Sequence, residues 1–152
     1  MLRTQAFGTT ALYDALTRTV HDLAHRSGKK VIVVFTDGID NASVLTTATA
    51  IDEAQGAGVP IYTIAQGDAL KSPALLRQLA GISKTTGGVA FTIHGPSEIR
   101  EVFESVSRDL MHGYLLAFQP APGDKREWRT IELVLHGSKG RRIRAREGYY
   151  PE

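Results

Sequence analysis

Helix-like and strand-like patterns of hydrophobic residues alternate along the first three quarters of the chain. Between residues 10 and 27, apolar side chains recur at spacings of three and four, which is typical of an amphipathic helix. These residues are Leu12, Leu16, Val20 and Leu23, and Gly28 is expected to end the helix. Residues 31–35 are an unbroken apolar run, which predicts a strand buried on both faces in a parallel sheet. The polar loop 36–41 ends this first unit.

The same unit is repeated further along the chain. The patterns predict helices over 46–55, over 72–86 and from 97 onward, with strands over 59–65 and 89–93. Ser72 and Pro73 open the second of these helices, as N-cap and first helical residue. Gly87 and Gly88 end it. Ser97 is expected to cap the last helix, with acidic residues near its positive end.

After residue 113 the alternation of helices and strands stops. Residues 114–118, 130–136 and 141–146 have strand-like patterns without helices between them, and 120–125 is expected to be a hairpin loop. The predicted fold class is therefore α/β, a Rossmann-like, doubly wound, mostly parallel sheet with a C-terminal antiparallel β extension. We assign residues 1–112 to the α/β part and 113–152 to the extension, packed on the same core.

Composition narrows the functional classes only slightly. The 152 residues include no cysteine, so a disulfide framework, a thiolate metal site and a cysteine nucleophile are excluded. The formal net charge of +2 is too small to indicate nucleic acid or a membrane as partner. No apolar run is long enough to span a membrane. The first residues do not form a signal peptide, so an export signal is expected upstream if the protein is exported.

Two oxygen-bearing residues stand where α/β proteins bind ligands. Asp37 follows the strand 31–35, and Gly38 after it permits a close approach of the backbone. Thr10 stands at the start of the preceding helix. Carboxylate and hydroxyl oxygens suit a hard divalent cation, and the carboxyl ends of parallel strands form the binding crevice of such folds. The alternative is that Asp37 caps a turn and Thr10 caps its helix, and spacing alone does not decide between the two.

Several segments together resemble the second half of a von Willebrand factor A domain. They are Gly8 to Leu16, Val31 to Asn41, Ile61 to Ala65 and the passage from Leu79 to Gly88. The closing segment, Arg144 to Tyr150, resembles a bacterial, acidobacterial-type branch of that family. The resemblance covers nearly the whole chain, and it implies a binding module that is not an enzyme.

The resemblance implies part of a metal-ion-dependent adhesion site. In that family three loops supply an Asp-x-Ser-x-Ser motif, a Thr and an Asp. Thr10 matches the second loop and Asp37 the third, whereas the first motif is absent and residues 40–44 do not replace it. Gly38, Asp40 and Asn41 are expected at the rim of the site. Because two ligands hold a cation poorly, we expect Mg²⁺ (or Mn²⁺ or Ca²⁺) to bind weakly or not at all.

The same resemblance implies a partner, a location and an open sheet edge. The expected partner is a protein or another macromolecule with an acidic group, not nucleic acid. A secreted, periplasmic or cell-surface location is expected. The family's missing first strand would lie beside residues 31–35, so this strand is expected to be a sheet edge. We therefore expect this exposed edge to cause self-association or aggregation, or to be covered by the β extension.

Other motifs in the sequence match sites with different chemistry, but each match is incomplete. His21 and His25 have the spacing of a zinc-protease helix, but a third ligand and a suitable base are missing. Asp37 could be a phosphoacceptor, yet the residues 8–10 have no role in that chemistry. Residues 83–86 are a poor phosphate loop because they end a helix. The basic run 139–146 is interpreted as a solvated strand face. A metal-free structural or assembly role remains the main alternative function.

Overall fold

A parallel sheet of three strands lies at the centre of the α/β part of the chain. The computed structural model describes residues 8–114, 116, 118–119, 127–134, 136–137 and 145–149. The strands are β1 (Ile32–Thr36), β2 (Ile61–Ala65) and β3 (Ala90–Thr92), in the order β1-β2-β3. Both neighbouring pairs are parallel. The predicted α/β class with a parallel sheet is confirmed.

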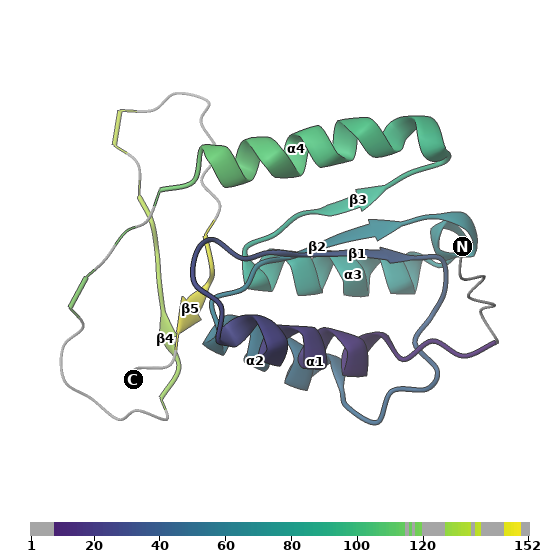
Figure 1. Cartoon of the computed structure of the whole chain (residues 1–152), viewed down its shortest axis with the longest axis horizontal. Helices are drawn as coiled ribbons and strands as arrows, with labels where there is room; N and C mark the ends of the chain where they lie inside the picture. Colours follow the sequence, from purple (N-terminus) through teal and green to yellow (C-terminus); the bar gives the residue numbers. More distant parts are fainter. Residues whose placement is uncertain are drawn as a thin grey trace.

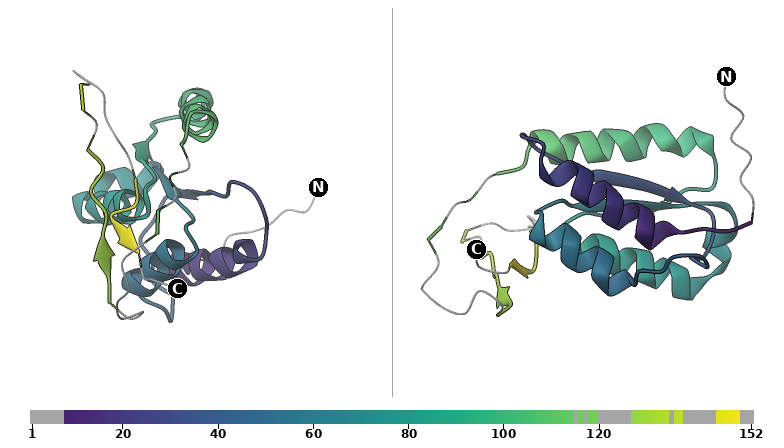
Figure 2. Two further views of the ribbon diagram at one scale, coloured as in Figure 1. Left: turned by 90° about the vertical axis from the view of Figure 1, so that its left-hand side faces the viewer. Right: turned by 60° about the horizontal axis from the view of Figure 1, so that its bottom comes forward.

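Helices cover both faces of this sheet. The α-helices are α1 (Leu12–Ala24), α2 (Thr47–Gly56), α3 (Pro73–Thr86) and α4 (Ile99–Met111), and two short 3-10 turns are η1 (Gly67–Lys71) and η2 (Pro96–Glu98). Helices α1, α2 and α3 contribute to one hydrophobic cluster on one side, and α4 packs on the other side. Figures 1 and 2 show α4 above the sheet and α1 and α2 below it.

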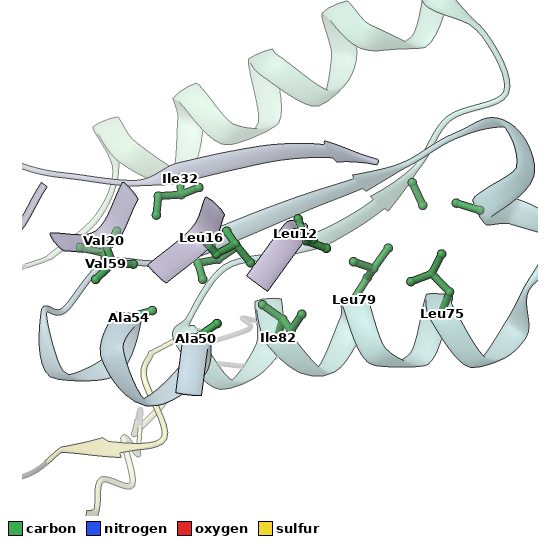
Figure 3. Close-up of a cluster of buried hydrophobic side chains, with 13 residues drawn as sticks. Leu12, Leu16, Val20, Ile32, Ala50, Ala54, Val59, Leu75, Leu79 and Ile82 are labelled. Atoms are coloured by element: carbon green, nitrogen blue, oxygen red, sulfur yellow. The ribbon is translucent and has the colours of Figure 1, made fainter. Parts of the chain in front are cut away.

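The main core lies between the sheet and the helices α1, α2 and α3, and Figure 3 shows its side chains. It contains the predicted stripe of α1 together with residues from α2, β2 and α3. The labelled members are Leu12, Leu16, Val20, Ile32, Ala50, Ala54, Val59, Leu75, Leu79 and Ile82. A smaller cluster of Ile64, Ile93 and Val102 holds α4 on the opposite face. Each strand is apolar on both faces because both faces are covered.

Helix α3 begins and ends where local sequence predicts. The Ser72 hydroxyl accepts the Leu75 N–H at 3.3 Å, and Pro73 occupies the first turn. At the other end Gly87 has a φ of 87°, in the left-handed region. The Gly87 N–H donates to Lys84 O at 3.2 Å and the Gly88 N–H to Ser83 O at 2.8 Å. These two bonds form the glycine-dependent helix ending known as the Schellman motif.

Helix α4 begins differently from the prediction. The expected N-cap, Ser97, lies inside η2, and the N-cap position is held by Glu98 without a side-chain cap. The Glu98 carboxylate instead accepts the His94 N–H at 3.3 Å. The prediction for Ser97 is therefore wrong, because the short turn that starts at Pro96 displaces the start of the helix by two residues.

Among the described residues of the C-terminal part there is a small second sheet. Strands β4 (Arg129–Thr130) and β5 (Gly148–Tyr149) pair in an antiparallel manner. Residues 114, 116 and 118 belong to no strand and are exposed, unlike the predicted strand there. The predicted loop 120–125 and residues 141–144 lie outside the described residues. In Figure 1 this part lies at the amino ends of β1 to β3, where Arg146 approaches Gly87.

Strand β1 is an edge of the three-stranded sheet within the described residues, as predicted. The Ile32 N–H donates to Pro60 O and Thr36 O accepts from the Gln66 N–H, so these groups face β2. Because alternate residues of a strand face opposite neighbours, the backbone groups of Val33 and Phe35 face the open side. Strands β4 and β5 pair with each other, and no strand in the part of the chain that the structure describes pairs with this edge.

Candidate functional site

Asp37 lies in a tight turn at the carboxyl end of β1. The buried Thr36 donates its hydroxyl to Gly38 O at 3.0 Å, which closes the turn and leaves the Asp37 side chain exposed. A Cβ on Gly67, the first residue of η1, would lie 3.6 Å from the Asp37 Cβ. Asp37 therefore follows the carboxyl end of β1 and lies close to the first residue of η1, which follows β2; Figure 1 shows this end of the sheet at the arrowheads. This crevice is where open α/β sheets bind ligands.

Thr10 is joined to the same loop through its backbone. Its N–H donates to Asn41 Oδ1 at 2.7 Å, and its carbonyl oxygen accepts the N–H groups of Asn41 at 3.0 Å and Ala42 at 3.1 Å. The N-cap of α1 is Ala11, so the alternative that Thr10 caps this helix is wrong. In the part of the chain that the structure describes, no hydrogen bond reaches the Thr10 hydroxyl or the Asp37 carboxylate.

Asp40 and Ser43 hold the first turn of α1 from outside the helix. The Ser43 hydroxyl accepts the N–H groups of Tyr13 at 3.0 Å and Asp14 at 3.1 Å. Asp40 Oδ2 accepts the Tyr13 N–H at 3.0 Å and the Ser43 hydroxyl at 2.6 Å. Partial burial of the Asp40 carboxyl raises its pKa, but the hydrogen bonds that it accepts outweigh burial and hold the pKa below its usual value.

The donor set suits a hard cation in type but is small in number. A Thr hydroxyl and an Asp carboxylate are the oxygen ligands that Mg²⁺ accepts, and Mg²⁺ takes about six of them. Over the described ranges, no group of three or more His, Cys, Asp or Glu side chains could hold a metal. The Thr10 hydroxyl and the Asp37 carboxylate are therefore compatible with a hard cation in donor type, but two such groups are too few to hold one.

Residues of the other sequence motifs form contacts in other parts of the structure. His21 Nε2 lies 3.1 Å from Glu53 Oε2 of α2, an exposed pair that links two helices. Ser83, in the phosphate-loop-like stretch, is buried and hydrogen bonded to the Thr63 hydroxyl at 3.0 Å. Arg146, the described end of the basic run, lies over the Tyr149 ring at 5.6 Å from its centre. The rest of that run, 139–144, lies outside the described residues.

Thr36, Ser43 and Asp14 were not predicted from the sequence, although their side-chain hydrogen bonds shape the loop after β1. Asp40 and Ser43 do have the spacing of a helix cap, but no helix follows them directly. The helix that they cap begins 28 residues earlier than Asp40 and 31 residues earlier than Ser43, at Leu12. A cap at such a separation has no local signal, since capping patterns relate neighbouring residues.

Comparison with known proteins gives a family match and distant similarity to solved structures. Residues 2–105 match the model of the von Willebrand factor type A domain. No curated protein matches the chain. A solved structure, described as an uncharacterized membrane spanning protein from Vibrio fischeri, is 20% identical with a TM-score of 0.49. The match covers 60% of this chain and 51% of that one, so this chain spans about half of that protein's length. No helix of the described residues is long and apolar enough to cross a membrane.

Proposed function

This chain belongs to the von Willebrand factor type A family, and we propose that it is a non-enzymatic module that binds a macromolecule through a cation-assisted site. Domains of this family generally mediate protein interactions. In the proposed site, Thr10 contributes its hydroxyl and Asp37 its carboxylate to Mg²⁺ or Mn²⁺, directly or through water. An acidic group of the partner takes an open coordination position. The partner is a protein or another macromolecule, and a secreted, periplasmic or cell-surface location is consistent with it.

One observation carries this proposal, namely which oxygen atoms of the loops are already used. The carboxylate of Asp40 and the side-chain oxygen of Asn41 accept backbone N–H groups. The Thr10 hydroxyl and the Asp37 carboxylate accept none among the described residues. A cation bound by the oxygens already used would have to displace these hydrogen bonds, so the unused oxygens are the better cation ligands. Gly38, Asp40 and Asn41 then form the rim of the site.

Mn²⁺ titration of the ¹⁵N-labelled protein tests the site directly. Mn²⁺ is expected to broaden the amide signals of Thr10, Asp37 and Gly38 at millimolar concentration. Asp37→Ala is expected to weaken the apparent affinity at least about tenfold, since even outer partners of metal ligands contribute roughly 10–100-fold. Asp22→Ala, at an exposed position of α1, is the matched control. Equal broadening in Asp37→Ala and in the unmodified protein would refute the site.

The main alternative is a metal-free structural or assembly role in a larger protein. It predicts that Mg²⁺ and Mn²⁺ leave the spectrum unchanged and that Asp37→Ala has no effect on partner binding. The open edge of β1 is compatible with both functions. The Mn²⁺ titration therefore separates the two, because only the cation-assisted module requires Asp37.

We further propose that the open edge of β1 supports self-association. Its outward backbone groups can pair with another strand. Phe35 lies beside this edge, 42% exposed, with its ring 6.0 Å from that of Phe103 in α4. We expect dimers at high protein concentration in size-exclusion chromatography with light scattering, and we expect Phe35→Lys to shift the protein to monomer. Val44→Lys, at a 91% exposed loop position, is the control. A monomer at every concentration would contradict this prediction.

A further inference from the structure

The residue that precedes α1 provides no side-chain cap, and residues of the loop after β1 cap the helix instead. A helix leaves its first N–H groups without partners inside the helix. The N-cap residue here is Ala11, which has no side-chain acceptor. The N–H groups of Tyr13 and Asp14 donate instead to Ser43 and Asp40, which follow β1. The loop after β1 therefore takes the place of a local cap.

A side chain of α1 in turn accepts hydrogen bonds from the backbone of the loop after β1. The Asp14 carboxylate, in the first turn of α1, accepts the N–H of Val44 at 3.0 Å with one oxygen and the N–H of Leu45 at 2.8 Å with the other. A carboxylate is favoured in the first turn by the helix dipole. This arrangement resembles a capping box, but it closes between two segments far apart in sequence. We refer to Asp14, Asp40 and Ser43 as the reciprocal cap.

Both carboxylate oxygens of Asp40 accept hydrogen bonds within the reciprocal cap. Its Oδ1 accepts the N–H groups of Ser43 at 3.0 Å and Ala42 at 3.3 Å, while Oδ2 accepts the Tyr13 N–H and the Ser43 hydroxyl. Direct coordination of a cation by Asp40 would sacrifice several of these bonds. Its carboxylate is therefore suited to hold the loop and not to bind the ion.

The reciprocal cap has a direct consequence for Thr10. Thr10 lies two residues before Leu12, the start of α1, and its backbone is bonded to Asn41 and Ala42, which lie between Asp40 and Ser43. Asp37 lies three residues before Asp40. Each side of the contact thus carries one candidate ligand, and the hydrogen bonds between the sides hold the two segments together.

We propose that Asp14, Asp40 and Ser43 are positioning residues that hold Thr10 against the Asp37 loop, so that the two candidate ligands form one site before a cation binds. This inference rests on the proposed function, because the site that it organises is the proposed cation site. The reciprocal cap acts through the backbone of Thr10 and touches neither ligand oxygen.

Amide hydrogen exchange tests the positioning without any cation. Ser43→Ala removes one hydroxyl, to which the Asp14 N–H donates, and is expected to speed exchange at Thr10 and Asp14 by about tenfold, as the loss of one or two hydrogen bonds would. Ser43→Thr retains a hydroxyl and is expected to restore the slow exchange. Ser107→Ala, at an exposed position of α4, is the control. Unchanged exchange at Thr10 in Ser43→Ala would overturn the positioning role, whatever the cation does.

Mn²⁺ broadening then distinguishes positioning from a purely structural cap. In the unmodified protein Thr10 and Asp37 are expected to broaden together. In Ser43→Ala, Asp37 is expected to remain broadened while the broadening at Thr10 is lost, and Ser43→Thr is expected to recover it. If Ser43→Ala loosens Thr10 but both signals broaden as before, the cap is structural only. If the unmodified protein shows no broadening at either residue, the proposed function fails, while the exchange result still decides the positioning.

Discussion

Gly88→Ala is expected to destabilise the protein by about 3 kcal/mol or more, at the upper end of the usual effect of adding a methyl group to a packed interior. Gly88 is buried, directly after α3, and a Cβ at this position would overlap the Ile61 carbonyl oxygen and lie 2.6 Å from the Ile61 carbonyl carbon. The neighbouring atoms are backbone of the central strand β2. They cannot move aside without disturbing the pairing of β2 with β1.

The matched control for Gly88→Ala lies in the same helix–turn segment. Gly81 is exposed on α3, and a Cβ there would have no neighbour within 4 Å. Gly81→Ala is expected to stabilise the protein by about 0.5–1 kcal/mol, because alanine favours a helix interior over glycine. Urea unfolding followed by circular dichroism measures both changes. Equal midpoints for Gly88→Ala and the unmodified protein would show that the turn after α3 does not approach β2 so closely.

The fold was predictable wherever one short stretch of sequence decides the structure. The apolar runs became β1, β2 and β3, and Ser72 and Gly87 begin and end α3 as local capping rules require. Element boundaries shifted by one to three residues, the largest shift being at the end of α1, and such shifts are usual for helix and strand ends. The Ser97 prediction failed because a turn beginning at Pro96 competes with the helix for the same residues.

The C-terminal part was predicted less well for a physical reason. An alternating pattern predicts a strand only if another surface covers its apolar side. In the described residues, Tyr114 and Leu116 are exposed and belong to no strand, and the second sheet consists of the pairing of β4 with β5. No strand among these residues pairs with residues 114, 116 or 118, so nothing there specifies the register of the apolar run 114–118.

The residues that support the loops of the candidate site were not predicted, whereas its two ligands stay a prediction. Asp37 was proposed from its place after a buried strand, Thr10 from its place at a helix start, and both from the family resemblance. The roles of Asp14 and Ser43 depend on a contact between segments about 30 residues apart. Capping rules describe neighbours along the chain, so they assign Asp40 and Ser43 to no helix. The structure alone brings these residues together at the start of α1.

Ile64→Ala is expected to destabilise the protein by about 2–5 kcal/mol, the usual range for large-to-small changes in a core. Ile64 is completely buried in β2, and its side chain packs with Ile93 and Val102. This cluster is the apolar attachment of α4 to the sheet. The cavity would therefore loosen α4 more than α1, α2 or α3, whose own cluster does not include Ile64.

Urea unfolding and hydrogen exchange together check the Ile64→Ala prediction. The unfolding midpoint is expected to fall, and amides of α4 are expected to exchange faster than those of α3, because local opening follows the weakened contacts. Ile39→Ala, at a 59% exposed loop position, is the control and is expected to change stability by less than about 0.5 kcal/mol. A uniform rise in exchange across all helices would mean that the smaller cluster unfolds only with the main core. The sheet would then be one cooperative unit, and the helices on its two faces would share a single stability.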